Sequence, residues 1–420
     1  MNVFTSTDFA SACASGTDWR DTSKSVLEKL DSIRTEGDEF NFGFIYISDY
    51  LADDATSIHN LFKSVLKIDN WVGSVGMGVI GNNESLLDKP AISAMIGKFP
   101  EGSFRVFPQN APDVNDIENS KPYKIEQDAV QQWLVENNPM LGIAHLDPLS
   151  ENDPQETLLN LESSTGSFII GGLTSSRSQH FQIANDVFDN GVGGVLFADT
   201  IPVSTTLSQG CLPLENSHVI TKADENVILE LDDKRAIDVL QSDLRALAGK
   251  KIGAELNEFS GSFSEVESSD KIPGEFKSLF RGQIHVALPF SQSDQKDFMV
   301  RNIIGMDDDE GSVSISEHIT GGQRMFFVER DEKSVSSDLS TALIALRKRV
   351  THERGCFEPK GAIYISCIAR GFSEDNSGAA NEMALIHDII GDIPLTGFYA
   401  GGEVNNARLY SYTGVIALFF

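Results

Sequence analysis

The chain has 420 residues, of which 40% are hydrophobic and 23% are charged. It is too long for one average domain, and its composition is that of a folded globular protein, which excludes a disordered or fibrous chain. The 33 Lys and Arg residues oppose 62 Asp and Glu residues, giving a formal net charge of −29. Because phosphate backbones and anionic lipids are bound through basic side chains, we expect a solvated acidic surface and neither nucleic acid nor a membrane as partner.

Targeting and cysteine signals are weak. No stretch approaches the ~18 consecutive apolar residues of a membrane span. Residues 1–20 lack the basic start and apolar run of a secretion signal, so the cytoplasm is the expected compartment. The four cysteines form no C-x-x-C pair, which predicts reduced thiols. The eight histidines form no H-x-x-x-H pair, so we expect no structural metal site.

The N-terminal half predicts a strand and a helix before residue 40, followed by two strand–helix–strand units. In the helix, Val26, Leu30 and Ile33 fall on one face. The first unit runs from a strand at 42–48, through an amphipathic helix, to a glycine-rich strand at 72–81. The second unit runs from 141–145 to 168–174. A hairpin is then expected between 181–188 and 192–198, through the turn dipeptide Asn190-Gly191.

The C-terminal half predicts a helix over 233–248 and a meander of strands at 283–290, 297–304, 312–316 and 323–329. A helix over 334–350 follows, and then a third strand–helix–strand unit from 361–367 to 395–403. The expected fold is therefore α/β and bilobal, with mixed parallel and antiparallel sheets built from repeated strand–helix–strand units and helices packed outside. We place the boundary between the lobes near 232–241.

Glycines end three of the predicted strands, and they are Gly76, Gly78, Gly171, Gly172, Gly401 and Gly402. A missing side chain lets the backbone approach either another backbone or a ligand closely. Residues 76–81 have the spacing of a dinucleotide-binding loop, but they are apolar and no helix is predicted after them, which argues against a phosphate site. Packing and pocket lining both stay open as roles for these glycines.

Cys367 ends a predicted strand and Arg370 follows it closely. Ligands of parallel strand units collect at the carboxyl ends of the strands, so Cys367, Arg370 and Glu403 are expected to share a cleft. Arg370 would suit a carboxylate or another planar anion. The alternative for Cys367, and for Cys211, is a small buried apolar side chain.

Seven segments in order resemble the FIST family, whose members pair an N-terminal and a C-terminal FIST domain. These segments are residues 73–81, 171–173, 208–213, 219–231, 297–305, 366–371 and 394–404. The resemblance covers the chain from about residue 40 to its end. It implies a FIST N-terminal domain at 40–232 and a FIST C-terminal domain at 233–420, after an N-terminal strand and helix at 1–39.

The resemblance implies a cytoplasmic sensory protein, not an enzyme, that binds a small ligand such as an amino acid and acts through a separate signalling protein. Some bacterial members are haem-containing nitric-oxide sensors that act on a histidine kinase or a cyclic-di-nucleotide enzyme, and a eukaryotic branch joins FIST to an F-box as a ubiquitin-ligase adaptor. No F-box pattern is evident here. We expect no cofactor; haem held by His145, an enzyme using Cys367 and an adaptor are the alternatives.

The ligand-binding residues expected on this basis are motif residues at strand ends, taken to face one cavity. They are Gly76, Gly78, Gly171, Gly172, Cys211, Arg301, Asn302, Cys367, Arg370, Gly371, Gly401, Gly402 and Glu403. No catalytic residue and no metal ligand is expected.

Overall fold

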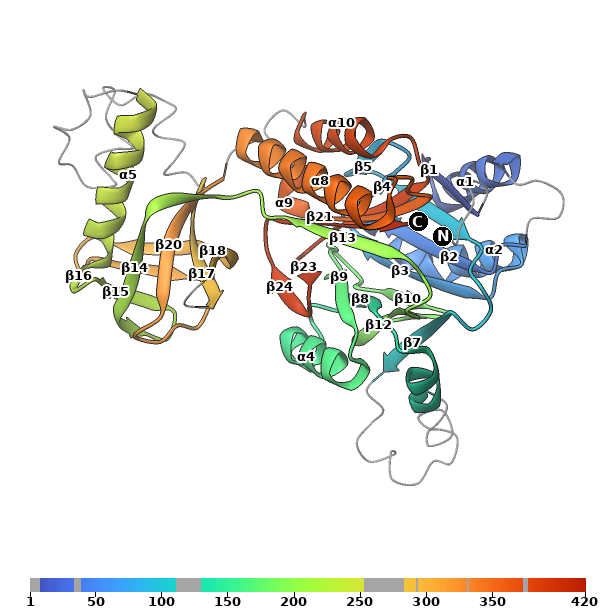
Figure 1. Ribbon diagram of the computed structural model, residues 1–420, viewed down its shortest axis with the longest axis horizontal. Helices are drawn as coiled ribbons and strands as arrows, with labels where there is room; N and C mark the ends of the chain where they lie inside the picture. The colour runs from blue at the N-terminus through green and yellow to red at the C-terminus, as the bar shows by residue number, and fades with distance from the viewer. Residues whose placement is uncertain are drawn as a thin grey trace. The chain divides into compact units, whose positions relative to one another are not determined.

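The computed structural model describes residues 8–33, 39–110, 130–252, 283–291, 294–330, 332–372 and 377–420. The chain divides into two compact units (Figure 1). Unit 1 consists of Met1–Gln209 and Asp338–Phe420, and unit 2 of Gly210–Ser337. Unit 2 is thus an insertion in the sequence of unit 1. The predicted boundary near 232–241 does not coincide with this division, because strands from both ends of the chain share the sheets of unit 1.

The described part of unit 1 contains three six-stranded mixed sheets. The first has the order β1 (Phe9–Ser15), β6 (Ala91–Gly97), β2 (Phe42–Ser48), β3 (Asn70–Gly76), β10 (Gln182–Ala184) and β11 (Val187–Phe188). The second has the order β24 (Arg408–Tyr410), β23 (Glu403–Asn405), β9 (Phe168–Leu173), β8 (Leu141–Leu146), β12 (Gly191–Phe197) and β7 (Phe104–Asn110). The third has the order β13 (Val203–Ser208), β25 (Gly414–Phe419), β21 (Gly361–Cys367), β22 (Leu395–Ala400), β4 (Gly78–Gly81) and β5 (Glu84–Leu87).

Each of these sheets contains a parallel pair of strands, namely β2 with β3, β8 with β9, and β21 with β22. Between the two strands of each pair, the chain forms α2 (Ala55–Leu66), α4 (Pro154–Thr165) and α10 (Ser377–Ile390), respectively. The helices α1 (Trp19–Ile33) and α8 (Glu332–Arg354) also pack on the outside of these sheets (Figure 1). The α/β class with mixed sheets is confirmed. No described helix is long and apolar enough to cross a membrane.

Local sequence explains how these helices begin and end. Ile58, Phe62 and Leu66 recur every four residues on one buried face of α2, which packs against the first sheet. The Asp153 side chain caps α4 by accepting a hydrogen bond from the Glu156 N–H at 2.8 Å. The helix ends at Gly166, whose φ of 69° is the left-handed conformation that glycine adopts easily.

The inner faces of the three sheets meet around an aromatic core. Phe42 of the first sheet, Phe197 of the second and Phe419 of the third are fully buried. The ring centroids of Phe42 and Phe197 lie 6.0 Å apart, and those of Phe197 and Phe419 lie 5.5 Å apart. Burying one such ring stabilises the fold by about 1.5–3 kcal/mol. The three sheets therefore share one core.

Unit 2 is built on a seven-stranded antiparallel sheet. Its order is β14 (Leu212–Asp224), β20 (Arg324–Glu329), β17 (Ile284–Ser291), β18 (Asp294–Asp307), β19 (Ser312–Ile315), β15 (Val227–Leu231) and β16 (Lys234–Arg235). The predicted meander is confirmed, because β17 pairs with β18 and β18 with β19, while β20 pairs with β17. Helix α5 (Ala236–Ile252) packs its apolar side chains on this sheet.

The predicted hairpin through Asn190-Gly191 is wrong. β10 pairs with β3 and β11, whereas β12 pairs with β7 and β8 in another sheet. Asn185, with φ 62°, lies in the turn between β10 and β11, and Asn190, with φ 56°, lies in the link from one sheet to the next. Both asparagines tolerate positive φ, so local sequence does not show which of them makes the hairpin turn.

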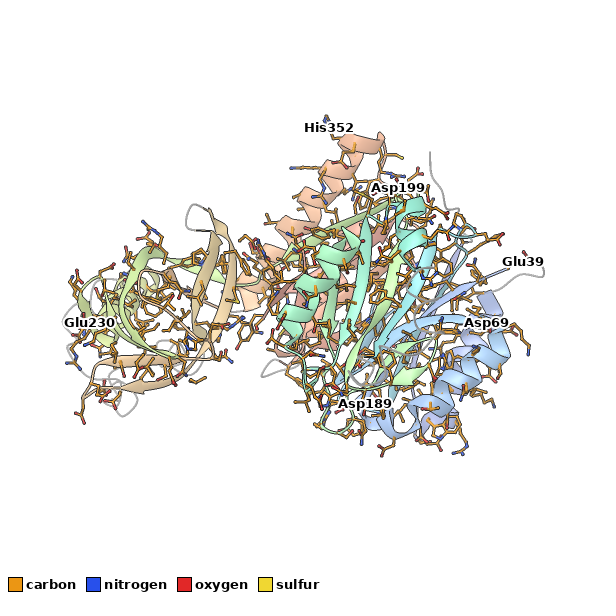
Figure 2. All side chains as sticks on the ribbon, turned by 90° about the horizontal axis from the view of Figure 1, so that it is seen from below. Glu39, Asp69, Asp189, Asp199, Glu230 and His352 are labelled. Atoms are coloured by element: carbon orange, nitrogen blue, oxygen red, sulfur yellow. The ribbon has the colours of Figure 1, made fainter. Side chains whose placement is uncertain are left out.

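Many acidic side chains are exposed, as the composition predicts, although a few such as Glu382 and Glu403 are buried. Glu39, Asp69, Asp189 and Asp199, labelled in Figure 2, are all exposed. Each keeps its hydration, so the excess of carboxylates imposes no burial cost at these positions.

Candidate functional site

The carboxyl ends of β3, β9 and β22 meet in unit 1. The hydroxyls of Ser74 in β3 and Thr174 after β9 lie 2.8 Å apart. The Leu173 N–H donates to the Gly402 carbonyl at 2.8 Å, and the Gly401 N–H donates to the Leu173 carbonyl at 3.0 Å, which joins the ends of β9 and β22. In α/β proteins, ligands bind outside the carboxyl ends of parallel strands. This meeting point is therefore the first place to look for a ligand site.

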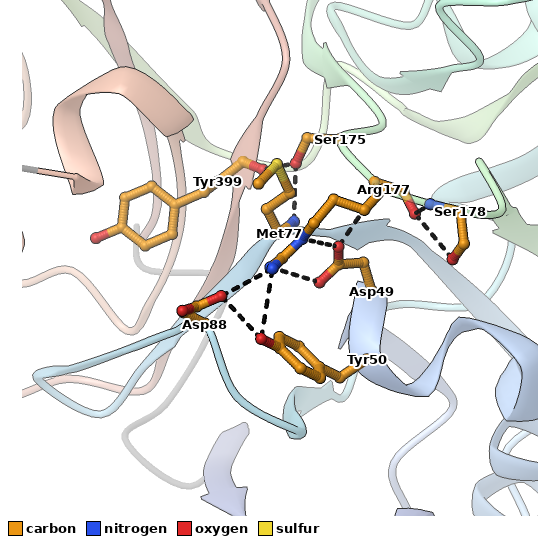
Figure 3. Close-up of polar contacts among 9 residues, drawn as sticks. Asp49, Tyr50, Met77, Asp88, Ser175, Arg177, Ser178 and Tyr399 are labelled. Carbon is orange, nitrogen blue, oxygen red and sulfur yellow. Dashed lines mark hydrogen bonds and ion pairs between the residues drawn. The ribbon is translucent and has the colours of Figure 1, made fainter.

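Ser175 connects all three strand ends. Its hydroxyl accepts a hydrogen bond from the Met77 N–H at 2.9 Å and donates to the Tyr399 carbonyl at 2.5 Å (Figure 3). Ser175 is buried, whereas Met77 is half-buried and Gly401 is exposed. The backbone of Met77 and Gly401 is thus accessible to solvent close to the buried Ser175 hydroxyl. We call Met77, residues 174–178 and Gly401 the strand-end edge.

Arg177 brings a cation to the strand-end edge. Its Nε donates to Asp49 Oδ2 at 2.8 Å and its Nη2 donates to Asp49 Oδ1 at 3.3 Å. Its Nη1 donates to Asp88 Oδ1 at 2.9 Å and to the Tyr50 hydroxyl at 3.4 Å (Figure 3). The Arg177 side chain is 47% exposed, while that of Asp49 is 3% exposed. A guanidinium carries five N–H groups in a planar fork, so this arrangement leaves donor capacity on a half-exposed group.

The acidic partners follow strands of two different sheets. Asp49 follows β2 directly, and Asp88 follows β5 and is 57% exposed. Hydrogen bonds from Arg177 and then from Tyr50 hold the pKa of Asp88 below its ordinary value. The site therefore presents a fixed cation and an exposed anion side by side. These are the complementary charges for a small ligand that itself carries both.

Sequence reasoning missed this cluster, although a signal for it exists. Asp49 is the first residue after the strand 42–48, and Arg177 lies in a short polar loop after the strand 168–173. Since carboxyl ends of parallel strands are the usual binding edge, charged residues at those two positions were candidates.

The predicted trio of Cys367, Arg370 and Glu403 comes together, but in the interior and not in an open cleft. The Arg370 side chain is 0% exposed. Its Nε donates to Glu382 Oε1 at 2.5 Å and its Nη1 donates to the Ser208 carbonyl at 3.0 Å. Arg370 is thus turned towards protein groups and does not present its guanidinium to a ligand carboxylate here.

Glu403 is a buried carboxyl beside Cys367. Its Oε2 accepts hydrogen bonds from the Thr413 N–H at 3.0 Å and from the Thr413 hydroxyl at 2.8 Å, while Oε1 has no hydrogen-bond partner. Burial raises the pKa of Glu403 to about 8, against the opposing effect of the Thr413 hydrogen bonds. Burial, and then the nearby Glu403, raises the pKa of Cys367 well above its ordinary value. A thiol in this state is a poor nucleophile, which disfavours the Cys367 enzyme hypothesis.

Close backbone approach explains the Gly171 and Gly397 positions. A Cβ on Gly171, whose φ is 149°, would lie 1.8 Å from the Ala144 carbonyl oxygen, and one on Gly397 would lie 1.6 Å from that of Tyr364. Both glycines let two parallel strands cross closely.

The remaining predicted glycines occupy packed positions near the same strands. An added Cβ would come within 3.0 Å of a neighbouring atom at four of them, which are Gly76, Gly78, Gly172 and Gly371, and within 3.2 Å at Gly402. Packing accounts for these glycines, whereas Gly401 is the exposed one.

Three predicted ligand-binding residues, Cys211, Arg301 and Asn302, belong to unit 2 and not to the strand-end edge. Cys211 is buried. Arg301 pairs with Glu317 at 2.8 Å, and the Asn302 N–H donates to the Ser316 hydroxyl at 3.2 Å. These contacts join β18 to the residues that follow β19, within unit 2.

His145 does not fit the role of haem ligand. The residue is fully buried, and its Nε2 lies 3.1 Å from the Tyr46 hydroxyl. Its ring packs against Tyr46 and Phe398, with centroid distances of 5.5 and 5.6 Å. Burial lowers the pKa of His145 to about 3. The ring is thus a neutral core residue held by aromatic neighbours, and it offers no open face to an iron. In the described ranges, no group of three or more His, Cys, Asp or Glu residues is placed to hold a metal ion.

Comparison with known proteins identifies the family. The FIST N domain model matches residues 41–234, and the FIST C domain model matches residues 266–406. The chain belongs to the FIST family. FIST domains are associated with sensory and ligand-binding signalling roles.

Two mycobacterial proteins are among the relatives of the chain. The chain is similar to the uncharacterized protein Rv0628c of Mycobacterium tuberculosis, with 25% identity over 368 residues and 83% of each chain covered. It is also similar to the uncharacterized protein Mb0898c of Mycobacterium bovis, with 28% identity over 277 residues, 60% of this chain and 61% of the relative. Neither name assigns a ligand or an output.

Proposed function

We propose that this FIST protein is a sensor without catalytic activity that binds a small zwitterionic ligand, such as an amino acid, at the strand-end edge. The observation that carries the proposal is the half-exposed Arg177 guanidinium, fixed by buried Asp49 at the point where three strand ends meet. The side chain is already ordered before a ligand arrives, so little conformational entropy is lost on binding.

Charge selects the class of ligand. Arg177 has one positive charge, and Asp49 and Asp88 have two negative charges between them. A simple anion would meet net repulsion, whereas a zwitterion places its carboxylate at the guanidinium and its ammonium at the exposed Asp88 carboxylate. The excess negative charge disfavours nucleic acid and anionic membranes as partners, and we propose output through a separate signalling protein.

A thermal-shift screen with the proteinogenic amino acids and small metabolites tests this function. A ligand that binds only the folded protein raises the melting temperature as its concentration rises. The expected result is a saturable shift for at least one zwitterion and no turnover of it during incubation. Chemical conversion of the compound that binds would contradict a role limited to sensing.

The position of the site is tested with charge variants. Asp88→Asn removes the proposed ammonium partner at an exposed position and should weaken binding about tenfold, the equivalent of one charge-assisted hydrogen bond. The control is Asp69→Asn, which changes an exposed aspartate that precedes β3, at the other end of this strand from Met77. Equal binding by both variants would place the ligand elsewhere.

A further inference from the structure

Both points at which the chain passes between the two units lie next to one buried cluster of unit 1. The chain leaves unit 1 after Gln209 and returns at Asp338. Just inside these limits, the Ser208 hydroxyl donates its proton to Asp338 Oδ2 at 2.8 Å. Strand β13 ends at Ser208, and Asp338 lies in helix α8. The outgoing and returning segments are therefore tied to each other within unit 1.

Arg370 donates hydrogen bonds to Ser208 and so stabilises this link. Its Nη1 donates to the Ser208 carbonyl at 3.0 Å and to the Ser208 hydroxyl at 3.2 Å, and its Nη2 also reaches that hydroxyl at 3.3 Å. Since the hydroxyl gives its one proton to Asp338, it is free to accept from Arg370, and the directions of all these bonds agree. The guanidinium thus fixes both the backbone and the side chain of the last residue of β13.

Glu382, the carboxylate partner of Arg370, also has hydrogen-bond partners on both of its oxygens. Glu382 of α10 is 2% exposed and accepts from Arg370 Nε through Oε1. Its Oε2 accepts from the Tyr364 hydroxyl at 3.0 Å and from the Ser366 hydroxyl at 3.1 Å. A buried ion pair costs desolvation that its Coulomb attraction often fails to exceed, so apolar packing would serve stability at least as well. The Arg370–Glu382 ion pair instead fixes the geometry of the chain where it leaves and re-enters unit 1, at Ser208 and Asp338.

We propose that Arg370 is a positioning residue that latches both crossing segments to unit 1 and so restricts the motion of unit 2. The inference is independent of the proposed ligand. Connected compact units move relative to each other unless something restrains them, and the hinges of such motions are a few residues at the ends of elements. Ser208, the last residue of β13, occupies such a position, and its hydroxyl is tied to Asp338 of helix α8, which runs from unit 2 into unit 1. Arg370 is the restraint on this link.

Hydrogen exchange of the full chain tests the local part of the proposal. In Arg370→Gln, exchange of the amides of 203–208 and 338–344 should accelerate at least tenfold more than exchange of the amides of β1 and β6, which reports the overall loss of stability. Arg347→Gln is the control, because Arg347 is an exposed arginine of α8 that donates to the Ile389 carbonyl. Faster exchange spread evenly over unit 1, or none at the crossing segments, would overturn the proposal.

Spin-label distances test the effect on unit 2. Labels at Asp69→Cys in unit 1 and Lys222→Cys in unit 2, with Cys356→Ser to remove the half-buried native thiol, report one distance distribution. Arg370→Gln should broaden that distribution at least twofold relative to the otherwise identical labelled protein. If Arg370→Gln does not fold, Ser208→Ala removes the hydroxyl link alone and should give a broadening in the same direction. An unchanged width in the variant that folds would contradict the latch.

Discussion

Two arginines of unit 1, each following a strand of a parallel pair and each paired with a carboxylate, differ in what covers them. Arg177 is bonded to Asp49 and Asp88 and keeps 47% of its side chain exposed. Arg370 is bonded to Glu382 of α10, and its side chain is 0% exposed. The same kind of ion pair thus gives a surface group that can bind a ligand at Arg177 and a buried structural contact at Arg370. The burial of each arginine by neighbouring helices and strands, and not the residue type, decides whether it can bind a ligand.

The largest expected effect comes from the buried arginine. Arg370→Met leaves the Glu382 carboxylate buried without its partner and should lower the free energy of unfolding by about 3–5 kcal/mol. Adding Glu382→Gln to this variant removes the unpaired charge and should restore part of the loss. Urea denaturation of the three proteins measures both effects. A loss that Glu382→Gln does not reduce would show that packing, not charge, governs this cluster.

Glu403 extends the comparison to an acid that is buried without a formal ion pair. Its pKa is about 8 in the folded protein against an ordinary value of 4.5, so the folded state holds more protons than the unfolded state between these pH values. Stability therefore falls as pH rises from 4.5 to 8.

Glu403→Gln should remove this dependence and raise the free energy of unfolding at pH 8 by a few kcal/mol, since one pKa unit corresponds to about 1.36 kcal/mol. Denaturation curves at pH 5 and pH 8 measure the difference. Glu101→Gln, at an exposed position, is the control. Parallel pH profiles for the wild type and Glu403→Gln would refute the assignment.

Unit 2 provides an intermediate case. His218 Nδ1 lies 2.6 Å from Asp232 and its Nε2 lies 2.9 Å from Asp243, so both ring nitrogens donate when the ring is protonated. The Asp243 hydrogen bond is the main cause of a raised pKa for His218. The resulting stability is fully present below pH 6.5, the ordinary His value, and is lost as pH rises through the higher folded-state pKa.

Asp243→Asn should therefore destabilise unit 2 at pH 6 by about 1.5–3 kcal/mol, the range for hydrogen bonds to charged groups. The difference from wild type should shrink as pH rises. Chemical denaturation between pH 5.5 and 8.5 measures it, with the half-exposed Asp238→Asn as control. A difference that grows with pH would mean that the folded protein holds a neutral ring.

The smallest effect on stability is expected for Arg177. Arg177→Gln removes a half-exposed cation, while the Arg177 backbone N–H, 3.1 Å from Asp49 Oδ2, stays in place. The pair with exposed Asp88 contributes about 0–1 kcal/mol, and buried Asp49 keeps the backbone hydrogen bond and loses a guanidinium that is itself half-exposed. The loss of stability should therefore be smaller than that of Arg370→Met, in which both partners are buried. Differential scanning calorimetry checks this, with Arg347→Gln for comparison. A loss as large as that of Arg370→Met would erase the distinction between the two arginines.

Periodicity and turn residues predict much of the fold. The spacing of Ile58 and Phe62 identifies α2, and the four strands of the meander lie close to their predicted ranges. Pairing between distant strands is not local information. Asn185 and Asn190 carry the same conformational preference, and only the burial of β12 between β7 and β8 decides which asparagine makes a hairpin.

The candidate site is harder to predict from sequence than the elements that form it. The order of segments places Cys367, Arg370 and Glu403 at strand ends, and they do lie together. Nothing in those residues shows that Glu382 of α10 neutralises Arg370 in the interior. Conversely, Asp49 and Arg177 are 128 residues apart, and only the meeting of two sheets brings them within 2.8 Å.

Binding of a ligand at the Arg177 side of the strand-end edge is tested by a thermal-shift screen run in parallel on the wild type and Arg177→Gln. We expect at least one zwitterionic compound to raise the melting temperature of the wild type in a concentration-dependent manner, with no shift in Arg177→Gln at the same concentrations. An equal shift in both proteins would mean that the ligand does not bind at Arg177.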